Sequence, residues 1–367
     1  MSACAACLRA SVLRSEGLIF AERRYASTVE ASRLLRLEPE AMLHQLRRDH
    51  PEIDESLARV TNELLSDARR REGLWTVCRH EPEFPERLRG FADLSDVPAV
   101  LYGVGRKELF DELTGDNGLA IVGARRASAY GREVAYSLAN EAASAGMIVV
   151  SGMALGVDGA AHRGALQAGA RTIAVLAGGP ELAYPRSHRL LHEQIRGGGC
   201  VISENPPGSK AQRWAFVARN RVIAGLAAMT VFVEGSEDSG AIHTVGFAEE
   251  LGSAIGAVPG PITGPLSTGP NKLLSAEGVT VICGISDVLD ELALNLGPSM
   301  IPGLGSDAVD ALGSTILELI AAGDRTPREL AQSLPDTAPR EISRSLGQLE
   351  LLGMVEREAS GEYLRRR

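Results

Sequence analysis

The stretch Leu119-Ala120-Ile121-Val122-Gly123, in the middle of a 367-residue chain, places four apolar residues directly before a glycine turn. A helix-length segment from about Gly131 follows, and then a second apolar run, Met147-Ile148-Val149-Val150. Strands that are apolar on both faces are typical of a parallel sheet, because helices cover both of its sides. The stretch therefore predicts a strand–helix–strand unit of an α/β fold.

Five more apolar runs continue this alternation of strand and helix. They are residues 172–176, 200–202, 229–233, 253–258 and 279–282. We expect residues 73–296 to form a parallel sheet with helices on both faces. Its ligand site should lie at the carboxyl ends of the strands, where such sheets bind ligands.

The segments on either side of this core have different patterns. Residues 1–72 carry apolar residues at three- and four-residue steps, which predicts a small helical accessory domain. Residues 297–305 are rich in glycine and proline, as in a linker. Residues 306–367 contain three helical patterns and a terminal hairpin, the plan of a winged-helix domain. The predicted fold class is thus α/β, with an N-terminal helical domain and a C-terminal winged helix.

The composition excludes several classes of protein. Hydrophobic residues make up 44% of the chain and charged residues 23%, which is typical of globular rather than disordered or fibrous proteins. We expect a cytoplasmic protein without a membrane partner, because no apolar run is long enough to span a bilayer and the first residues lack a secretory pattern. Five cysteines in a chain of this length do not indicate a disulfide framework.

The net charge of −9 is unevenly distributed along the chain. Residues 121–226 contain twelve basic and six acidic residues, a net charge of +6, so the rest of the chain carries −15. Electrostatic binding depends on local patches rather than on the total charge. The asymmetry therefore favours a basic face on an acidic protein over arginines scattered across the surface.

The motifs of the common enzyme classes are absent from the sequence. It has no GxxxxGK[ST] phosphate loop, no GxGxxG after a strand, no HExxH and no GxSxG. We therefore expect no catalytic residue and no bound cofactor. Glu234, at the end of an apolar run, is a candidate general base, but the lack of a partnered nucleophile favours a structural role.

Glycines, arginines and small hydroxyl residues follow the predicted strands instead. Arg125 and Arg126 follow the first strand and provide charge-assisted donors for phosphate beside a helix N-terminus. Gly152 follows the second strand, and Ser239 with Gly240 follows a later one. Ordinary strand-to-helix turns also contain such glycines, so this second interpretation stays open.

The most informative stretch covers residues 210–226. Four cations and two aromatic residues, with no acidic residue among them, lie in its first twelve positions. They are Lys210, Arg213, Trp214, Phe216, Arg219 and Arg221. Cations that follow a phosphate backbone, interleaved with rings on which bases stack, are typical of single-stranded nucleic-acid binding. The alternative that Trp214 and Phe216 are core residues at a helix entry stays open.

Two arrangements have the spacing of metal ligands. Cys4 and Cys7 form a CxxC pair, but no second CxxC pair follows to close a tetrahedral site. His188 and His192 are one helical turn apart, without a visible third ligand. We therefore expect no metal site.

In their order along the chain, several motifs resemble the DNA-processing protein A (DprA/Smf) family over residues 83–292. They are Phe84-Pro85-Glu86-Arg87-Leu88, Pro98-Ala99-Val100-Leu101-Tyr102, Val122-Gly123-Ala124-Arg125, Ser151-Gly152-Met153-Ala154, Tyr184-Pro185, Arg219-Asn220-Arg221-Val222, Ser239-Gly240 and Val258-Pro259-Gly260. The resemblance implies an extended Rossmann-like core that dimerises, binds and protects incoming single-stranded DNA, and loads RecA recombinase in natural transformation. It implies no enzymatic activity.

The resemblance also implies which residues line the DNA-binding pocket. They are Arg125, Gly152, Lys210, Arg213, Phe216, Arg219, Arg221, Ser239 and Gly240. We add Arg126, Trp214 and Asn220 as candidate DNA-binding residues. By resemblance, the dimer interface lies around residues 285–292.

Three positions depart from the residues that are usual in the family. Leu155 stands where an arginine is usual, Val217 where a proline is usual, and His243 where an aliphatic residue is usual. Loss of the arginine weakens one phosphate contact that the resemblance implies. We therefore expect either weaker DNA binding or compensation by Arg126 or Arg186.

Two other functions remain open at this point. A nucleotide-processing hydrolase of the phosphoribohydrolase type has a related sheet, but residues 239–244 lack the glycine pair of its PGGxGTxxE signature. A transcription factor would need a basic winged helix, whereas residues 306–367 contain eight basic and eleven acidic residues. That acidity favours a protein contact or autoregulation for the C-terminal segment.

Overall fold

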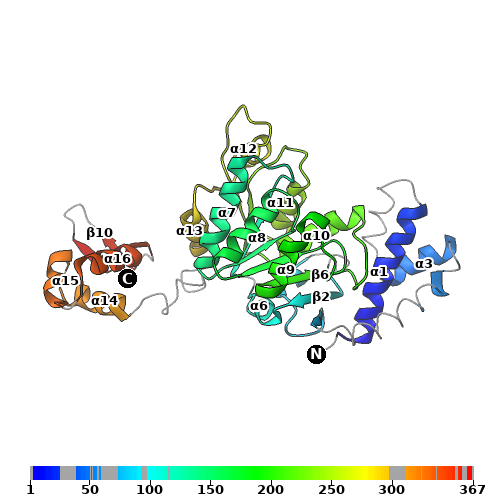
Figure 1. The fold of residues 1–367 in the computed structure, drawn as a ribbon, viewed down its shortest axis with the longest axis horizontal. Helices are drawn as coiled ribbons and strands as arrows, with labels where there is room; N and C mark the ends of the chain where they lie inside the picture. The colour runs from blue at the N-terminus through cyan, green and yellow to red at the C-terminus, as the bar shows by residue number, and fades with distance from the viewer. Residues whose placement is uncertain are drawn as a thin grey trace. The chain divides into compact units, whose positions relative to one another are not determined.

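The computed structural model divides the chain into two compact units, residues 1–295 and 296–367 (Figure 1). The residues that the structure describes are 3–24, 39–49, 51, 53–55, 58, 73–91, 97–114, 116–296, 311–323, 325–335, 337–351, 354–357 and 362–365. The predicted linker, residues 297–305, lies outside the described residues.

A nine-stranded sheet forms the centre of the first unit. In spatial order its strands are β1 (Leu74–Cys78), β2 (Val100–Gly105), β6 (Cys200–Ser203), β5 (Thr172–Val175), β4 (Ile148–Ser151), β3 (Gly118–Val122), β7 (Met229–Phe232), β8 (Ala254–Ala257) and β9 (Val279–Val281). The strands from β6 to β9 are parallel, whereas β2 is antiparallel to both β1 and β6. The core is therefore an α/β fold with a large, mostly parallel sheet.

The seven parallel strands are those that the apolar runs predicted. The expectation of a wholly parallel sheet is wrong, because β1 and β2 add an antiparallel edge. Antiparallel neighbours need no crossover helix. The alternation of apolar run and helix, which revealed the other strands, therefore gives no signal for these two.

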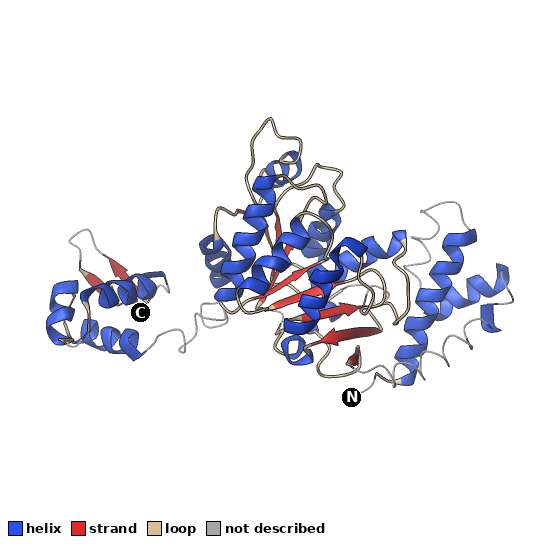
Figure 2. Ribbon diagram, viewed as in Figure 1, coloured by secondary structure: helices blue, strands red, loops and turns tan. Residues whose placement is uncertain are grey.

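Helices cover both faces of the sheet (Figure 2). On one face lie α7 (Ala129–Ser144), α8 (Val157–Gln167) and α9 (Arg189–Gly198). On the other lie α5 (Glu86–Arg89), α6 (Lys107–Asp111), α10 (Arg213–Gly225) and α11 (Ala241–Glu250). The first unit also contains α12 (Thr268–Leu273) and all but the last residue of α13 (Ile285–Leu296).

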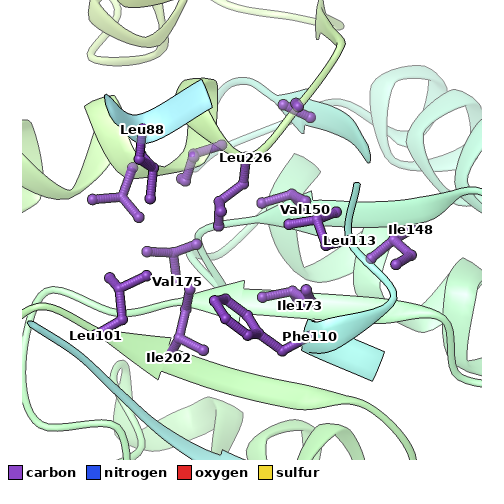
Figure 3. Close-up of a cluster of buried hydrophobic side chains, with 14 of the residues drawn as sticks. Leu88, Leu101, Phe110, Leu113, Ile148, Val150, Ile173, Val175, Ile202 and Leu226 are labelled. Carbon is purple, nitrogen blue, oxygen red and sulfur yellow. The ribbon is translucent and has the colours of Figure 1, made fainter. Parts of the chain in front are cut away.

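The larger apolar cluster lies between the sheet and the second group of helices (Figure 3). Val150, Val175 and Ile202, from neighbouring parallel strands, belong to it together with Leu88 of α5 and Leu226, which follows α10. Each is fully buried, and burial of such a side chain contributes roughly 1.5–3 kcal/mol. This packing fixes α10 against the sheet, beside the carboxyl ends of the parallel strands.

Two helices, α1 (Ala5–Arg24) and α3 (Pro39–Asp49), occupy the described part of the N-terminal segment. The start of α1 packs on the edge of the sheet, where Cys7 is buried with Val100 and Tyr102 of β2. The backbone N–H of Ala3 donates a hydrogen bond to Thr76 Oγ1 of β1 at 2.9 Å. The N-terminus of α1 is thus attached to β1 and β2.

The second unit contains α14 (Ala311–Ala322), α15 (Pro327–Ser333), α16 (Pro339–Leu351) and an antiparallel pair, β10 (Val355–Arg357) and β11 (Tyr363–Arg365). Thr326 and Glu329 form a capping box at the start of α15. Ile316, Leu330 and Leu346 form part of its small apolar core. In the described part of the whole chain, no helix combines the length and apolar character needed to cross a membrane.

Candidate functional site

The order of the parallel strands reverses at β3. From β3 the chain moves outward through β4, β5 and β6, then returns to β7 on the other side of β3 and continues to β8 and β9. Ligands bind at such a switch point, beyond the carboxyl ends of the strands. A cleft of about 630 Å³ opens there, between the segments that follow β3 and β7.

The cleft brings together seven of the twelve residues that the sequence singled out. They are Arg125, Arg213, Phe216, Arg219, Asn220, Ser239 and Gly240. They come from the loop after β3, from α10 and from the segment that begins α11. Three segments far apart in the sequence therefore form one surface.

A cation and two rings form one wall of this cleft. The guanidinium carbon of Arg125 lies 5.1 Å from the centre of the Phe216 ring. The Phe216 ring lies 5.2 Å from the Tyr184 ring, with an angle of 50° between their planes. Tyr184 is 46% exposed and Phe216 is half-buried, so both rings remain accessible in the cleft. The arrangement offers a stacking surface next to a positive charge.

A further wall is the segment that begins α11. Asn220 Nδ2 donates a hydrogen bond to the carbonyl of Gly240 at 3.1 Å, which joins α10 to this segment. Ser239 Oγ accepts a longer hydrogen bond, 3.4 Å, from the N–H of Ala241, the first residue of α11. The N-terminus of α11 therefore faces the cleft, and helix N-termini favour anions.

Arg219 forms the floor of the cleft. Its Nη1 donates to the carbonyls of Gly152 and Val175, each at 2.6 Å, which joins the ends of β4 and β5. Burial lowers the pKa of Arg219 to about 10, and the nearby Asp158 carboxylate opposes that shift. Nη1 of the guanidinium is thus committed to backbone carbonyls, whereas the buried Nε has no hydrogen-bond partner among the described residues.

Gly152 supports this arrangement instead of lining the cleft. A Cβ atom at this position would lie only 1.9 Å from Nη1 of Arg219. The residue must therefore be glycine for the arginine side chain to reach the strand ends. Gly152, a predicted residue of the binding pocket, is therefore placed beside Arg219 and not among the residues that line the cleft.

Arg221 points away from the cleft. It is 2% exposed, and its Nη1 and Nη2 donate to the two carboxylate oxygens of Glu204 at 2.8 and 2.6 Å. Burial raises the pKa of Glu204, but the attraction of Arg221 outweighs it and leaves that pKa below its ordinary value. The structure therefore places Arg221, a predicted DNA-binding residue, outside the cleft, with its charge neutralised by Glu204 in the interior.

Three other predicted residues lie outside the cleft. Trp214 is half-buried in the first turn of α10, and its Nε1 has no hydrogen-bond partner among the described residues. Arg126 is exposed on the loop after β3 without lining the cavity. Lys210 is exposed and lines an adjoining cavity instead.

The adjoining cavity extends the basic surface along α9. Its volume is about 940 Å³, and exposed Arg186, Arg189 and Arg196 line it together with Lys210. Tyr184 lines both cavities. The basic surface therefore continues from the cleft at the switch point, past Tyr184, into the adjoining cavity. A ligand longer than one nucleotide requires a surface that extends in this way.

Several residues of the cleft were not predicted. Tyr184 was named above only as part of a family motif. Aromatic residues are scarce in this chain, which has six tyrosines, so this ring could have been singled out from the sequence. Asp158 lines the cleft as a buried carboxylate that accepts a hydrogen bond from the N–H of Ala154 at 3.3 Å. Burial raises the pKa of Asp158, and Arg219 opposes that shift. Val217 and His243, two of the unusual positions, also face the cavity.

Glu234 has a structural role, which confirms the favoured interpretation. Its carboxylate accepts hydrogen bonds from the backbone N–H of Ser128 at 2.9 Å and from Ser128 Oγ at 2.6 Å. Ser128 is the N-cap of α7, and its Oγ accepts a hydrogen bond from the N–H of Gly131. Glu234 thus holds the end of β7 to the start of α7.

The two arrangements with metal-like spacing have different outcomes. His188 pairs with the carbonyl of Met153, and His192 pairs with the carbonyl of Pro180, so these histidines do not face a common ligand. Cys4 and Cys7, in contrast, lie together with Cys78 and His80. The inference that this CxxC pair lacks partners is wrong, because the remaining donors come from the end of β1 in a CxH pattern.

Comparisons with known proteins match both the core and the fold. The family model of DNA recombination-mediator protein A matches residues 75–293. DNA processing protein DprA of Bacillus subtilis (strain 168) is 34% identical over 252 residues, which are 69% of this chain and 80% of the relative. Putative DNA processing protein DprA of Mycobacterium tuberculosis (strain H37Rv) is 37% identical over 262 residues, 71% of this chain and 67% of the relative.

Two solved structures share the architecture. The X-ray structure of DNA processing protein A from Streptococcus pneumoniae aligns with a TM-score of 0.61 and 26% identity, over 79% of this chain and 99% of that one. The Helicobacter pylori protein, whose structure concerns its single-stranded DNA binding mode, aligns with a TM-score of 0.53 and 27% identity, over 60% of this chain and 96% of that one. The chain therefore belongs to the DNA recombination-mediator protein A family, as the sequence motifs predicted.

Proposed function

We propose that the protein binds single-stranded DNA in the cleft at the β3–β7 switch point. The observation that carries this proposal is the arrangement of Arg125, Phe216 and Tyr184, which places two accessible rings beside an exposed guanidinium. Rings that stack on bases and cations that contact phosphates are the two elements of single-strand recognition. Arg213 adds a second exposed cation to the same cavity.

The preference for an unpaired strand follows from the stacking surface. A base inside a duplex already stacks on its neighbours, so it reaches Phe216 or Tyr184 only if the duplex opens. The adjoining cavity, with Lys210 and three arginines, provides contacts for the phosphates that continue from the cleft. Membership of the family and the DNA-binding relative from Helicobacter pylori support the same proposal.

The wider role that we propose rests on family membership. In it the protein protects incoming DNA in the cytoplasm and loads RecA recombinase during natural transformation or recombination, as a homodimer with contacts around residues 285–292. Residues 1–72 form a helical accessory domain, and residues 306–367 form a winged-helix domain with a protein-binding or regulatory role.

We propose no catalytic step for this cleft. Glu234 does not line the cleft, and its carboxylate is bound to Ser128, the N-cap of α7, while Asp158 accepts a hydrogen bond from the backbone of Ala154, so both carboxylates have structural contacts. A hydrolase of the phosphoribohydrolase type would release free base from a nucleoside monophosphate. An assay for that release tests the alternative directly.

Fluorescence anisotropy with one labelled oligonucleotide, single-stranded or annealed to its complement, tests the proposal. We expect the native chain to bind the single strand more tightly. The variant Arg125→Ala/Arg213→Ala should weaken that binding at least about 10-fold, which corresponds to 1.4 kcal/mol. The matched control is Arg106→Ala/Arg328→Ala, which removes two exposed arginines outside both cavities. Equal affinities for both variants, or a preference for the duplex, would contradict the proposal.

A further inference from the structure

Four side chains with soft or nitrogen donor atoms meet where α1 begins. Cys4 directly precedes α1 and Cys7 lies in its first turn, while Cys78 is the last residue of β1 and His80 follows two positions later. Their donor atoms, three sulfurs and one imidazole nitrogen, all lie within 4.8 Å of one another. This cluster, the Cys4–His80 cluster, is separate from the cleft and from its adjoining cavity.

The distances within the cluster fit coordination of one metal ion. His80 Nδ1 lies 3.6 Å from Cys4 Sγ and 3.4 Å from Cys7 Sγ. A tetrahedral zinc ion has bonds of about 2.3 Å to sulfur and about 2.0–2.1 Å to nitrogen, which places a sulfur and a nitrogen ligand about 3.6 Å apart. The donors are therefore spaced as the ligands of a single ion would be.

Packing alone does not account for the cluster. Cys7 and Cys78 are buried beside Tyr102 and behave in part as small apolar residues. Cys4 and His80, however, are exposed. Burial of apolar surface therefore does not explain why their donor atoms point toward Cys7 and Cys78. A shared ligand explains why all four donors converge.

The backbone around the cluster is held in place by other contacts. Cys78 N–H donates to Glu81 Oε2 at 2.6 Å, and the N–H of Glu81 donates back to the carbonyl of Cys78 at 2.8 Å. Arg89 Nη2 donates to the carbonyl of Glu81 at 2.6 Å. On the other side, Ala3 is attached to Thr76 of β1. The turn that presents His80 is thus fixed independently of any ion, as a metal site requires.

We propose that Cys4, Cys7, Cys78 and His80 bind one Zn²⁺ ion that joins the start of α1 to the end of β1. A Cys₃His set of four protein ligands leaves no position for water or substrate, so the ion is structural rather than catalytic. Three thiolates select zinc over the hard cations Mg²⁺ and Ca²⁺. Binding displaces the thiol protons, and the resulting centre of one Zn²⁺, three thiolates and a neutral imidazole carries a charge of −1.

Metal analysis of the full-length protein tests the site. The chain is purified under reducing conditions without a metal-affinity tag, and its zinc content is measured by plasma mass spectrometry. We expect about one zinc ion per chain. Replacement by Co²⁺ should give the intense visible bands and the sulfur-to-cobalt charge transfer of a tetrahedral thiolate site. A protein that holds only traces of zinc and shows no such charge transfer with Co²⁺ would overturn the proposal.

Matched variants locate the ion. His80→Ala and Cys4→Ser change exposed residues of the cluster, so the core should fold without them. Each should lower the affinity for Zn²⁺ at least about 100-fold. Loss of a residue that only supports a metal ligand costs up to about 100-fold, and loss of a ligand itself should cost at least as much. His44→Ala and Cys283→Ser change an exposed histidine and an exposed cysteine elsewhere and should leave the zinc content unchanged. Full zinc content in His80→Ala and Cys4→Ser would place the ion elsewhere and overturn the assignment.

Hydrogen exchange gives a readout of the structural role. Removal of zinc by a chelator should increase amide exchange in α1 while β3, β4 and β7 remain protected, because the ion attaches only the start of that helix. Binding of the single-stranded oligonucleotide should not change in His80→Ala, since the cluster is separate from the cleft. Unchanged exchange in α1 after the zinc is removed would contradict the proposed attachment.

Discussion

Phe216 is the residue on which the proposed contact with a base depends most directly. Its ring centre lies 5.1 Å from the Arg125 guanidinium carbon and 5.2 Å from the centre of the Tyr184 ring. The ring therefore has a fixed position before any ligand binds, and little side-chain entropy remains to be lost on stacking. A base that stacks there gains nearly the full interaction.

Phe216→Leu should therefore weaken binding of a single strand by about 1–3 kcal/mol, roughly 5- to 150-fold. Phe216→Tyr retains the ring and should bind like the native chain. An oligonucleotide of abasic sites cannot stack, so Phe216→Leu and the native chain should bind it equally. Anisotropy titrations with both strands measure the difference. A Leu variant that binds the base-containing strand as tightly as the native chain would show that no base stacks at this ring.

His162 is a buried histidine that links pH to stability. It is fully buried in α8, and its Nδ1 pairs with Thr172 Oγ1 at 2.8 Å. Burial lowers its pKa from 6.5 to about 3, and the charges of His188 and Arg219 add to that shift. The unfolded chain therefore takes up this proton at a higher pH than the folded one. The contribution of the neutral, buried His162 to the free energy of unfolding is fully present above pH 6.5. It is lost as the pH falls toward 3.

Urea unfolding measured from about pH 7 down to about pH 5 tests this linkage. As the pH decreases, the free energy of unfolding of the native chain should fall, and His162 should account for up to about 1.4 kcal/mol of that fall per pH unit. His162→Gln should remove that part of the slope. His44→Gln, at an exposed histidine, should keep it. Equal slopes for His162→Gln and the native chain would show that His162 does not titrate differently on unfolding.

At the scale of elements, α10 decides which cations are available. Successive residues of a helix are rotated by about 100°. Arg213, Phe216 and Asn220 therefore share one face, and all three line the cleft. Arg219 and Arg221 lie about 100° to either side of Asn220, and both are buried. The helical spacing alone separates these two arginines from the exposed face of Arg213, whereas counting cations in the stretch did not; Arg219 still reaches the floor of the cleft.

The Glu204–Arg221 pair fixes α10 to the end of β6. Arg221→Met should lower the free energy of unfolding by about 3–5 kcal/mol, because it leaves a buried carboxylate without its partner. Glu204→Met/Arg221→Met removes both charges and should be closer in stability to the native chain than the single variant is. Denaturant titrations of the three proteins measure this. A single variant within about 0.5 kcal/mol of the native chain would show that the pair is not a buried anchor.

The strands differ in how well the sequence predicted them. The apolar runs of β3, β4 and β7 are fully buried and lie in the centre of the sheet, where helices cover both faces. At the outer edge, Leu74 and Trp75 of β1 are only partly buried, and α1 supplies part of the cover for β1 and β2. Both strands are apolar, but the helices that follow them, α5 and α6, have only four and five residues, so they do not show the alternation of strand and long helix that revealed the parallel strands.

At the scale of the whole molecule, the distribution of charge was predictable but the fate of each arginine was not. The sequence places a net charge of +6 in residues 121–226 of a chain that carries −9. The structure exposes Arg125, Arg186 and Arg213 around two adjoining cavities and buries Arg219 and Arg221. Whether a guanidinium faces solvent or an internal acceptor depends on the packing around it, which composition does not contain.

The Cys4–His80 cluster shows the same limit. A CxxC pair is visible in the sequence, but its partners at Cys78 and His80 follow after a long interval in a different pattern. Only the attachment of α1 to β1 brings the two pairs together. The cleft was easier to predict, because its glycines, arginines and rings all follow strands that end at one edge of the sheet.

The dependence of DNA binding on salt tests the central claim most directly. Each phosphate contact with a single strand changes the slope of log affinity against log salt by about 0.7. We expect the affinity of the native chain for a single strand to fall with salt, and the slope for Arg125→Ala/Arg213→Ala to be smaller by about 1.4. Arg106→Ala/Arg328→Ala should keep the native slope. If Arg125→Ala/Arg213→Ala instead shows the native slope and the native affinity, the cleft at the β3–β7 switch point is not where the protein binds DNA.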